Sequence, residues 1–300
     1  MATGISISST SNLSSGQKIL IAAARTANEP AAPDPDLWNV EKLPTGHKDF
    51  VQNTFARLAA ASALTEGTDL AEVQQLVTAT SSITPTEHGI ISTPSKRLIA
   101  RQGDSSVVGT IGKLLGIALR IREALDIITL YDPFAKSIGG AGTTLDVAYY
   151  RGANAFLMTD PGVAYGPAMP PFKSSLHIEQ ISDIIMDISS TNDKGSTQVG
   201  ATQPGMSQEM LQTWWKASDR LYGTQIFHGG NITRDASSDS KGIIGSTDCI
   251  TLVHAVDADP TEEVDNSMRA VEYGLFQVWG EAMVVDAHGA EIYSNSAATV

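Results

Sequence analysis

The chain is poor in cysteine, in basic residues and in long apolar runs. Its 300 residues include a single cysteine, Cys249, so no internal disulfide can form and nothing indicates an oxidising compartment. The sequence has no run of about 18 consecutive apolar residues, and it therefore predicts no transmembrane helix. The first residues lack the basic and apolar regions of a secretory signal, so we expect none there.

Positive charge is also scarce. The chain has 20 Lys and Arg against 33 Asp and Glu, which gives a formal net charge of −13. A free-standing nucleic-acid binder needs a basic face, and no run of Lys or Arg is available to build one. If the chain encloses DNA, we expect it to do so without gripping it.

Patterns for nucleophilic or nucleotide chemistry are missing. The six histidines are scattered, with no pair four residues apart, and Gly205-Met206-Ser207-Gln208 lacks the Gly-x-Ser-x-Gly elbow. The stretch Gly109-Thr110-Ile111-Gly112-Lys113-Leu114 has the wrong spacing for a phosphate loop, so we interpret it as a helix interior. Cys249 lies in an apolar run and is expected to be a buried, inert thiol. We therefore predict no catalytic residue and no cofactor.

Possible metal ligands are equally weak. His254 and Asp257 would point to opposite faces of a predicted strand, which argues against a shared ion. A loop holds three more aspartates without the spacing of a calcium loop: Asp235, Asp239 and Asp248. A loose calcium contact there is the weaker alternative, and the prediction is that the chain has no metal site.

Residues 73–99 form the first of two stretches that organise the chain. A Thr- and Val-rich strand over 73–83 leads to a turn, Thr84-Pro85-Thr86-Glu87-His88-Gly89, and a second strand over 90–93 returns. Pro85 pre-sets one turn dihedral and Gly89 tolerates a positive φ, so this pattern predicts a β-hairpin. Because a two-stranded ribbon is only marginally stable alone in water, we expect it to lie on another surface.

The second stretch predicts a long helix over 104–131, which would span roughly 42 Å at about 1.5 Å per residue. Apolar side chains recur every three or four residues along it: Val107, Ile111, Leu114, Leu115, Ala118, Ile121, Leu125 and Ile128. Three glycines, Gly109, Gly112 and Gly116, each disfavour a helix by about 1 kcal/mol relative to Ala. Their expected use is the close approach of another backbone.

The remaining sequence predicts alternating short elements. Helices are expected over 18–25, 50–62, 177–189 and 207–222, and strands over 145–150, 250–256 and 270–278. Extended arms or loops are expected over 1–17, 28–39, 159–173, 190–206 and 229–246, and a small-residue tail ends the chain.

One family resembles this order of elements. Ala63-Leu64-Thr65-Glu66-Gly67, a strand with Thr78 and Thr80, the segment Thr84 to Gly89, a second strand and a long helix follow one another. Together they resemble the front half of tailed-phage major capsid proteins with the Hong Kong 97-type fold. The resemblance covers about residues 45–135, and it lies in the order of the elements rather than in any one motif.

The resemblance implies an α+β fold of the Hong Kong 97 type, with an N-terminal arm, an extended β-hairpin loop, a peripheral domain with a long spine helix, and an axial domain. The expected boundaries are 1–62 for the arm and short helices, 63–103 for the extended loop, 104–150 completed by about 265–300 for the peripheral domain, and 151–264 for the axial domain.

The same resemblance implies a major capsid protein that assembles through hexamers and pentamers into an icosahedral shell around viral DNA, in a virion built in the host cytoplasm. Its expected partners are other copies of itself, with portal, scaffold and cement proteins as further candidates; DNA is enclosed without specific binding and no membrane is involved. The expected contacts between subunits are Thr65, Glu66, Gly67, Thr84, Pro85, Thr86, Glu87, His88 and Gly89. An encapsulin-like nanocompartment shell protein and a soluble α/β enzyme are the alternatives.

Overall fold

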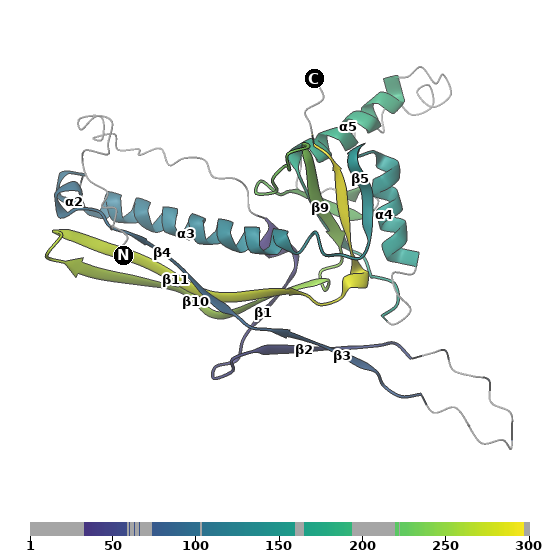
Figure 1. Cartoon of the computed structure of the whole chain (residues 1–300), viewed down its shortest axis with the longest axis horizontal. Coiled ribbons are helices and arrows are strands. Elements are labelled where there is room, and N and C mark those ends of the chain that lie inside the picture. The colour runs from purple at the N-terminus through teal and green to yellow at the C-terminus, as the bar shows by residue number, and fades with distance from the viewer. Residues whose placement is uncertain are drawn as a thin grey trace.

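The computed structural model describes residues 33–58, 74–102, 104–159, 165–193, 220–221 and 223–296, together with the isolated positions 60, 63 and 66. A long lobe, a smaller second lobe and a projecting two-stranded ribbon make up the described chain (Figure 1). The expected arm over 1–17 and the expected helix over 18–25 lie outside the described residues, as does nearly all of the helix expected over 207–222.

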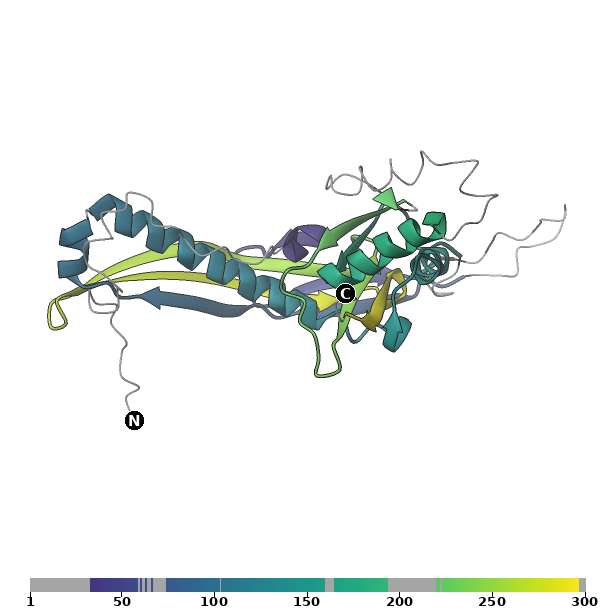
Figure 2. The same cartoon turned by 90° about the horizontal axis from the view of Figure 1, so that it is seen from above.

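The long lobe consists of one long helix on a four-stranded sheet. Helix α3 (Asp104–Thr129) runs along one face of the sheet, as Figures 1 and 2 show, and confirms the predicted long helix. The sheet has the order β1-β10-β11-β4, with β1 (Asn39–Lys42), β10 (Ile250–Asp265), β11 (Ala270–Met283) and β4 (Thr86–Ser92). Two short helices pack against α3, namely α1 (Asp34–Leu37) and α2 (Lys96–Gln102).

The buried face of α3 explains how it lies on the sheet, but it coincides only in part with the predicted stripe. Leu115 is buried as predicted, whereas Leu114 and Leu125 are 39% and 37% exposed. Leu119 and Ile127 are buried against Leu252 of β10 and Trp279 of β11 in one apolar cluster. Burying a side chain of this size stabilises the fold by about 1.5–3 kcal/mol. The contact between α3 and the four-stranded sheet, which we call the seam, is therefore a main source of stability for the long lobe.

A buried carboxylate joins the two lobes. Asp34 in α1 accepts hydrogen bonds from the Tyr131 hydroxyl and the Ser175 hydroxyl, both at 2.6 Å on the same oxygen. Burial raises the pKa of Asp34, although both hydrogen bonds act in the opposite direction. Since Tyr131 follows α3 and Ser175 belongs to the second lobe, Asp34 holds the lobes in register.

The second lobe contains a six-stranded mixed sheet of order β5-β12-β9-β6-β8-β7. Its strands are β5 (Ser137–Thr144), β6 (Phe172–Leu176), β7 (Arg220–Leu221), β8 (Thr224–His228), β9 (Asp239–Gly245) and β12 (Gly289–Asn295). Helices α4 (Val147–Thr159) and α5 (Ile178–Asp193) bury Tyr150, Leu157 and Ile184 against this sheet, and the short helix η3 (Asp286–His288) precedes β12. Helix α5 confirms the helix predicted over 177–189.

The ribbon pairs β2 (Phe50–Phe55) with β3 (Thr78–Ile83) in antiparallel register, from Phe50 opposite Ile83 to Phe55 opposite Thr78. Its root is anchored, because Phe50 and Ile83 pack with Val253 of β10. From this root the ribbon projects from the long lobe toward the lower right of Figure 1, and the Arg57 side chain lies close to Gly166, in the loop between α4 and β6.

The predicted pairing of this hairpin is wrong. Strand β3 pairs with β2, and β4 pairs with β11 inside the four-stranded sheet. Thr84 and Pro85 therefore join the ribbon to the sheet, and Thr86 to Gly89 are the first residues of β4 rather than a hairpin turn. Turn chemistry at Pro85 identifies a change of direction, but it does not say which distant strand each side will pair with.

Several other predictions are also wrong. Residues 50–62 begin with β2 rather than a helix, because the spacing of Phe50, Val51, Phe55 and Leu58 suits a helix as well as an exposed ribbon. The strand expected over 145–150 is the start of α4, the expected loop 229–246 contains β9, the extended stretch 28–39 contains α1, and the expected tail contains β12.

The lobes also divide the chain differently from the expected domains. Strand β10, expected largely in the axial domain, lies in the sheet of the long lobe. Strand β12, expected to complete the peripheral domain, lies in the sheet of the second lobe, next to β5 and β9. Both departures come from strand pairings between residues far apart in the sequence.

Candidate assembly surfaces

The ribbon exposes large apolar side chains among polar ones. Along β2, Val51 and Phe55 point outward and are 55% and 57% exposed, whereas Phe50 packs at the root. Beyond the strands, Leu58, Leu76 and Val77 are 55–63% exposed. In the described part of the ribbon, residues 50–58 and 74–83, Arg57 is the one charged side chain.

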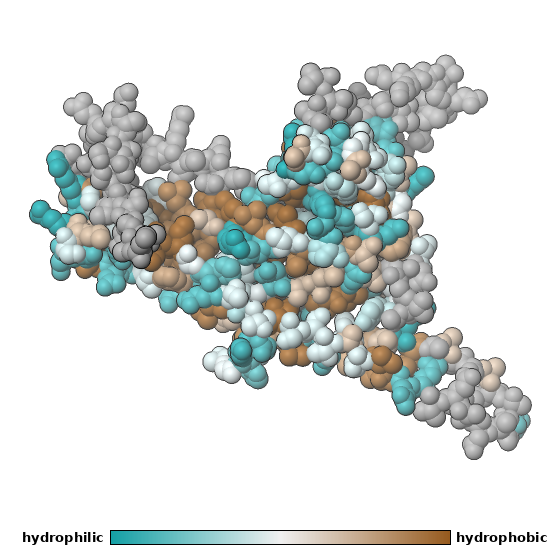
Figure 3. Space-filling model, in the orientation of Figure 1, coloured by the Kyte–Doolittle hydropathy of each residue, from teal (hydrophilic) through white to brown (hydrophobic). Residues whose placement is uncertain are grey.

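Large apolar side chains grouped on a surface indicate an interaction site. Two strands have no second layer in which to bury such side chains, and a free two-stranded ribbon is only marginally stable. Figure 3 shows apolar residues along the ribbon at the lower right of the molecule. The ribbon is therefore the first candidate assembly surface.

The structure separates the predicted contact residues into two groups. Glu66 is exposed beyond the ribbon strands, while Thr65 and Gly67 lie outside the described residues. The second group, Thr84 to Gly89, lies about the start of β4, where Thr84 donates a 2.6 Å hydrogen bond to Asp49 and Pro85 lies against Gly280. These six residues thus follow the root of the ribbon and not its far end.

Within that second group, two residues pack inside their own sheet. The His88 ring stacks on buried Trp279 with the ring centroids 3.9 Å apart. Gly89 is exposed, but it lies beside the Phe276 ring, which a Cβ at position 89 would meet at 2.3 Å. Thr84, Thr86 and Glu87 are also exposed.

The seam between α3 and the sheet holds three carboxylates. Glu123 and Asp126 of α3 are buried, and Arg120 and Arg122 pair with them at 2.9 and 2.7 Å. Glu281 of β11 faces them, and burial, followed by the charge of Asp126, raises the pKa of Glu281 to about 7. Sequence reasoning missed this cluster because its members come from strands and helices that meet only in the fold.

A histidine contributes to the same seam. His254 Nε2 lies 3.1 Å from Glu123 Oε1, without hydrogen-bond alignment, and its Nδ1 lies 3.0 Å from Gln277 Nε2. Asp257, considered with His254 as a possible metal ligand from the sequence, points away from the seam and forms an exposed ion pair with Lys42 at 2.5 Å. The two residues therefore do not form one site.

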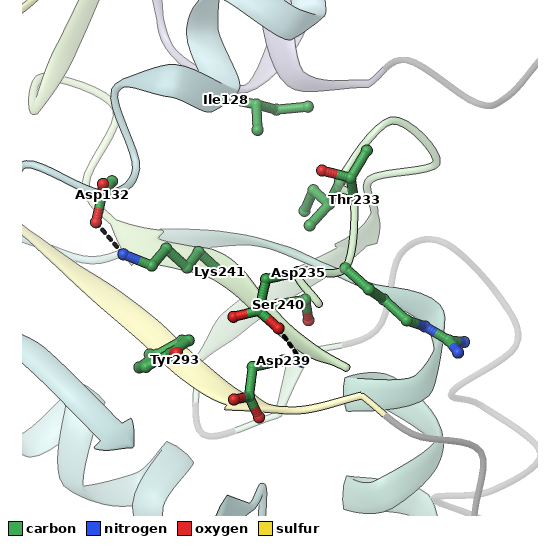
Figure 4. Close-up of a pocket in the computed structure, with 10 residues that line it drawn as sticks. Ile128, Asp132, Thr233, Asp235, Asp239, Ser240, Lys241 and Tyr293 are labelled. Carbon is green, nitrogen blue, oxygen red and sulfur yellow. Dashed lines mark hydrogen bonds and ion pairs between the residues drawn. The ribbon is translucent and has the colours of Figure 1, made fainter. Parts of the chain in front are cut away.

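A hollow of about 230 Å³ lies beyond the C-terminal end of α3 (Figure 4). Lys241 reaches across it to Asp132, pairs with Glu291 at 3.2 Å and lies 5.1 Å from the centre of the Tyr293 ring. These contacts tie the end of α3 to β9 and β12, so we interpret the hollow as a structural junction.

The aspartates of the calcium alternative are not gathered in one place. Asp235 accepts the backbone N–H groups of Ser237 and Asp239 within one turn, whereas Asp248 pairs with His288 at 2.9 Å. This contact lowers the pKa of Asp248. Across the described ranges, no three His, Cys, Asp or Glu residues are placed to hold a metal ion.

Two further predictions concern buried or closely packed positions. Cys249 is fully buried, and burial raises the pKa of its thiol, as expected for an inert cysteine. Gly109, Gly112 and Gly116 have no described atom within 4 Å of the position of an added Cβ. The described chain itself therefore does not make the close approach expected at these glycines. Within the same ranges, no helix is long and apolar enough to cross a bilayer.

Comparison with known proteins gives matches through structure alone. No protein-family model and no curated protein matches the sequence. A chain of the head structure of Helicobacter pylori bacteriophage KHP40 matches 91% of this chain and 94% of its own, with a TM-score of 0.69 and 11% identity. A chain from the capsid of Ralstonia phage GP4 matches 93% and 95%, with a TM-score of 0.68 and 10% identity.

A chain of the empty GTA particle capsid also matches, over 91% of this chain and 93% of its own, with a TM-score of 0.59 and 10% identity. Because each match spans nearly the whole of both chains, this chain has the fold of the phage capsid chains. The predicted fold class, an α+β fold of the Hong Kong 97 type, is confirmed at this level.

Proposed function

We propose that the chain is a major capsid protein, the subunit that assembles through hexamers and pentamers into an icosahedral shell around viral DNA. The observation that carries the proposal is the match of its fold, over 91–93% of the chain, to chains of phage heads and capsids. In this role the protein is a structural component of the virion, assembled in the host cytoplasm, and not an enzyme.

The ribbon supports self-association. Its described part presents five exposed apolar side chains, two on the outer face of β2 and three beyond the strands. Covering them with a neighbouring subunit contributes on the order of 5 kcal/mol before the cost of ordering. The exposed residues Glu66, Thr86 and Glu87 are proposed to contact neighbours as well, with Thr65, Gly67, Thr84, Pro85, His88 and Gly89 beside them in the chain.

The charge of the chain supports a wall that encloses DNA without gripping it. A net charge of −13 repels a phosphate backbone and gives packaged DNA no general reason to adhere. Portal, scaffold and cement proteins are proposed as further partners of the assembled shell.

The test is to purify the protein and examine it by sedimentation and negative-stain electron microscopy. Closed shells or capsomers are the expected result. A monomer or small oligomer at every concentration and salt would contradict the proposal and favour the enzyme alternative. Particles from the native host that hold a protein cargo and no DNA would favour the nanocompartment instead.

A further inference from the structure

The far end of the long lobe, where β10 turns into β11, has a free strand edge. Strand β1 pairs with β10 only from Thr251 to His254, so the outer edge of β10 beyond that point has no partner strand among the described residues. Residues 256–264 are all exposed. We call the region formed by residues 256–272 and α2 the tip.

Strand addition by another chain is discouraged along this edge. The pairing of β10 with β11 is irregular between His254 and Val256 and again between Val256 and Asp259. Pro260, which has no N–H to donate, follows at once. Bulges, proline and charge are the devices that keep an edge from pairing with another strand, so a contact at the tip would be made by side chains.

The free edge is acidic. Four exposed or half-exposed carboxylates of the tip have no ion-pair partner among the described residues: Asp259, Glu262 and Glu263 on β10, and Glu272 on the adjoining β11. Two more already have partners within the subunit, since Asp257 pairs with Lys42 and Asp265 accepts hydrogen bonds from Ser267. The strand register sets Glu263 directly opposite Glu272, an arrangement of like charges that destabilises a sheet. A cation from outside the subunit would relieve this repulsion.

The same tip carries a separate basic set: Lys96 and Arg97 at the start of α2, and Arg269 in the turn between β10 and β11. All three are exposed. A 2.9 Å bond from the Lys96 N–H to the Arg269 carbonyl holds them together, and Lys96 Nζ donates to Asn266. No ion pair joins any of the three to a described residue.

The backbone at Arg269 adds a second observation. Arg269 has φ +53, in the left-handed region that turns usually fill with Gly or Asn. The turn keeps an arginine in a conformation that disfavours it. Residues kept in this region cluster at functional positions, and this motivates a functional use of Arg269.

Glu263 and Glu272 lie on the opposite side of the sheet from α2, whereas Glu262, opposite Tyr273, is on the α3 side. Leu275 and Trp279 pack on the α3 side, so the alternation along β11 turns Glu272, and Glu263 opposite it, to the far side. Helix α2, which begins with Lys96 and Arg97, packs against α3 and therefore lies on the near side (Figures 1 and 2), while Arg269 lies in the turn at the end of the sheet. The tip is markedly hydrophilic at the left of Figure 3.

We infer that the tip is a head-to-tail contact between copies of this chain, in which Lys96, Arg97 and Arg269 of one copy bind Glu263, Glu272 and their neighbours on the next. Glu263 and Glu272 are complementary in charge to the basic set, and within one copy they lie on the side of the sheet away from α2. A net charge of −13 makes copies repel as whole bodies, so contacts between them need local opposite charges of this kind. Such a contact uses two different surfaces and closes into a ring when the rotation between copies permits.

This inference rests on the proposed assembly of copies, and charge reversal tests it. One variant carries Glu263→Lys and Glu272→Lys, a second carries Lys96→Glu and Arg97→Glu, and a third carries all four changes. Glu41→Lys on exposed β1 is the control for charge reversal away from the tip. The readout is the protein concentration at which shells form, measured by sedimentation and checked by electron microscopy.

Each two-residue variant should raise that concentration about tenfold or more, and the four-residue variant should return it to within about threefold of the wild type, because the pairs are restored with reversed sign. Two-residue variants that assemble like the wild type and the control would overturn the inference and leave the capsid proposal intact. A wild type that forms no shells would count against the capsid proposal itself.

Folding is checked separately by thermal unfolding of unassembled subunits. If reversal lowers stability, Glu263→Gln with Glu272→Gln replaces it, since this change also removes the repulsion between the two carboxylates. That variant should fold at least as well as the wild type and still assemble several-fold less readily. Unchanged assembly by this variant would also overturn the inference.

Discussion

The ribbon and the tip are both exposed, but their chemistry differs. The ribbon, residues 50–58 and 74–83, presents Val51, Phe55, Leu58, Leu76 and Val77 with Arg57 as its one described charge. The tip presents carboxylates along β10 and β11 and a basic set on the other side of the sheet. Apolar contacts supply affinity with little directional preference, whereas charges select the partner and its orientation. We interpret the ribbon as the adhesive surface and the tip as the orienting one.

The largest effect on assembly is expected from making the ribbon polar. Val51→Asp with Phe55→Asp should abolish shell formation, because two charges would have to be desolvated in the contact between subunits. Both side chains point outward, so the melting temperature of the subunit should change little. Sedimentation and electron microscopy measure the assembly, and thermal unfolding measures the stability.

The matched control for the ribbon is Val40→Asp. Val40 lies on β1 of the four-stranded sheet, and its side chain is 49% exposed. It should assemble normally if apolar exposure matters only on the ribbon. Normal shells from the ribbon variant would remove the assigned adhesive role.

Asp34 variants test how much the junction between the lobes contributes to the stability of the subunit. Asp34→Ala leaves the Tyr131 and Ser175 hydroxyls buried without their acceptor, and should lower the free energy of unfolding by about 3 kcal/mol. Urea unfolding measures this change. Asp36→Ala, two residues away in the same helix, removes only a largely exposed pair with Arg120 and should cost less than about 1 kcal/mol. Equal losses for the two variants would contradict the role given to Asp34.

The salt dependence of assembly distinguishes the apolar contact at the ribbon from the charged contact at the tip. Raising the salt from about 0.05 M to about 0.5 M screens surface charges and should raise the assembly concentration of the wild type roughly threefold. Glu263→Gln with Glu272→Gln should show a clearly weaker dependence on salt, whereas Glu41→Gln should keep the dependence of the wild type. Identical salt curves for all three proteins would argue against an electrostatic contact at the tip.

Glu281 tests a third use of charge, inside the α3 seam. Its pKa in the folded chain, about 7, lies above its ordinary value of 4.5, so the folded state binds the proton more tightly than the unfolded state. This group therefore stabilises the fold below about pH 4.5, and its contribution is lost as the pH rises to about 7.

Glu281→Gln imitates the protonated form. Relative to the wild type, it should stabilise the subunit at pH 8 by about 1 kcal/mol, a value discounted for partial exposure, and by little at pH 5. Urea unfolding at the two pH values measures the difference. A variant equally stabilised at both pH values would assign the effect to packing and not to the proton.

The parts of the structure that follow local rules were predictable from the sequence. Helix α3 follows from apolar residues at spacings of three and four, and α5 follows from the same pattern around Ile181 and Ile185. Cys249 lies in an apolar run that becomes the buried β10. In these cases the periodicity of neighbouring residues is itself the signal.

The candidate surfaces were only partly predictable. The order of elements identified an extended loop. However, the pairing of β2 with β3 places residues 84–89 at the root of the ribbon, whereas the sequence predicted them in the turn of a hairpin. The opposition of Glu263 and Glu272 cannot be read from the chain, because it depends on the register of β10 and β11. The seam carboxylates are likewise separated by more than 150 positions, between Asp126 and Glu281.

Neighbouring residues in the chain are thus enough to predict the long helix, and the composition shows the scarcity of basic charge and of recognisable catalytic patterns. The pairing of the strands, the exposure of the apolar residues and the side of the sheet on which each charge lies depend on the folded structure. The physical reason is that helix formation depends on residues three and four apart, whereas sheet register and burial depend on contacts between residues that are remote in the chain.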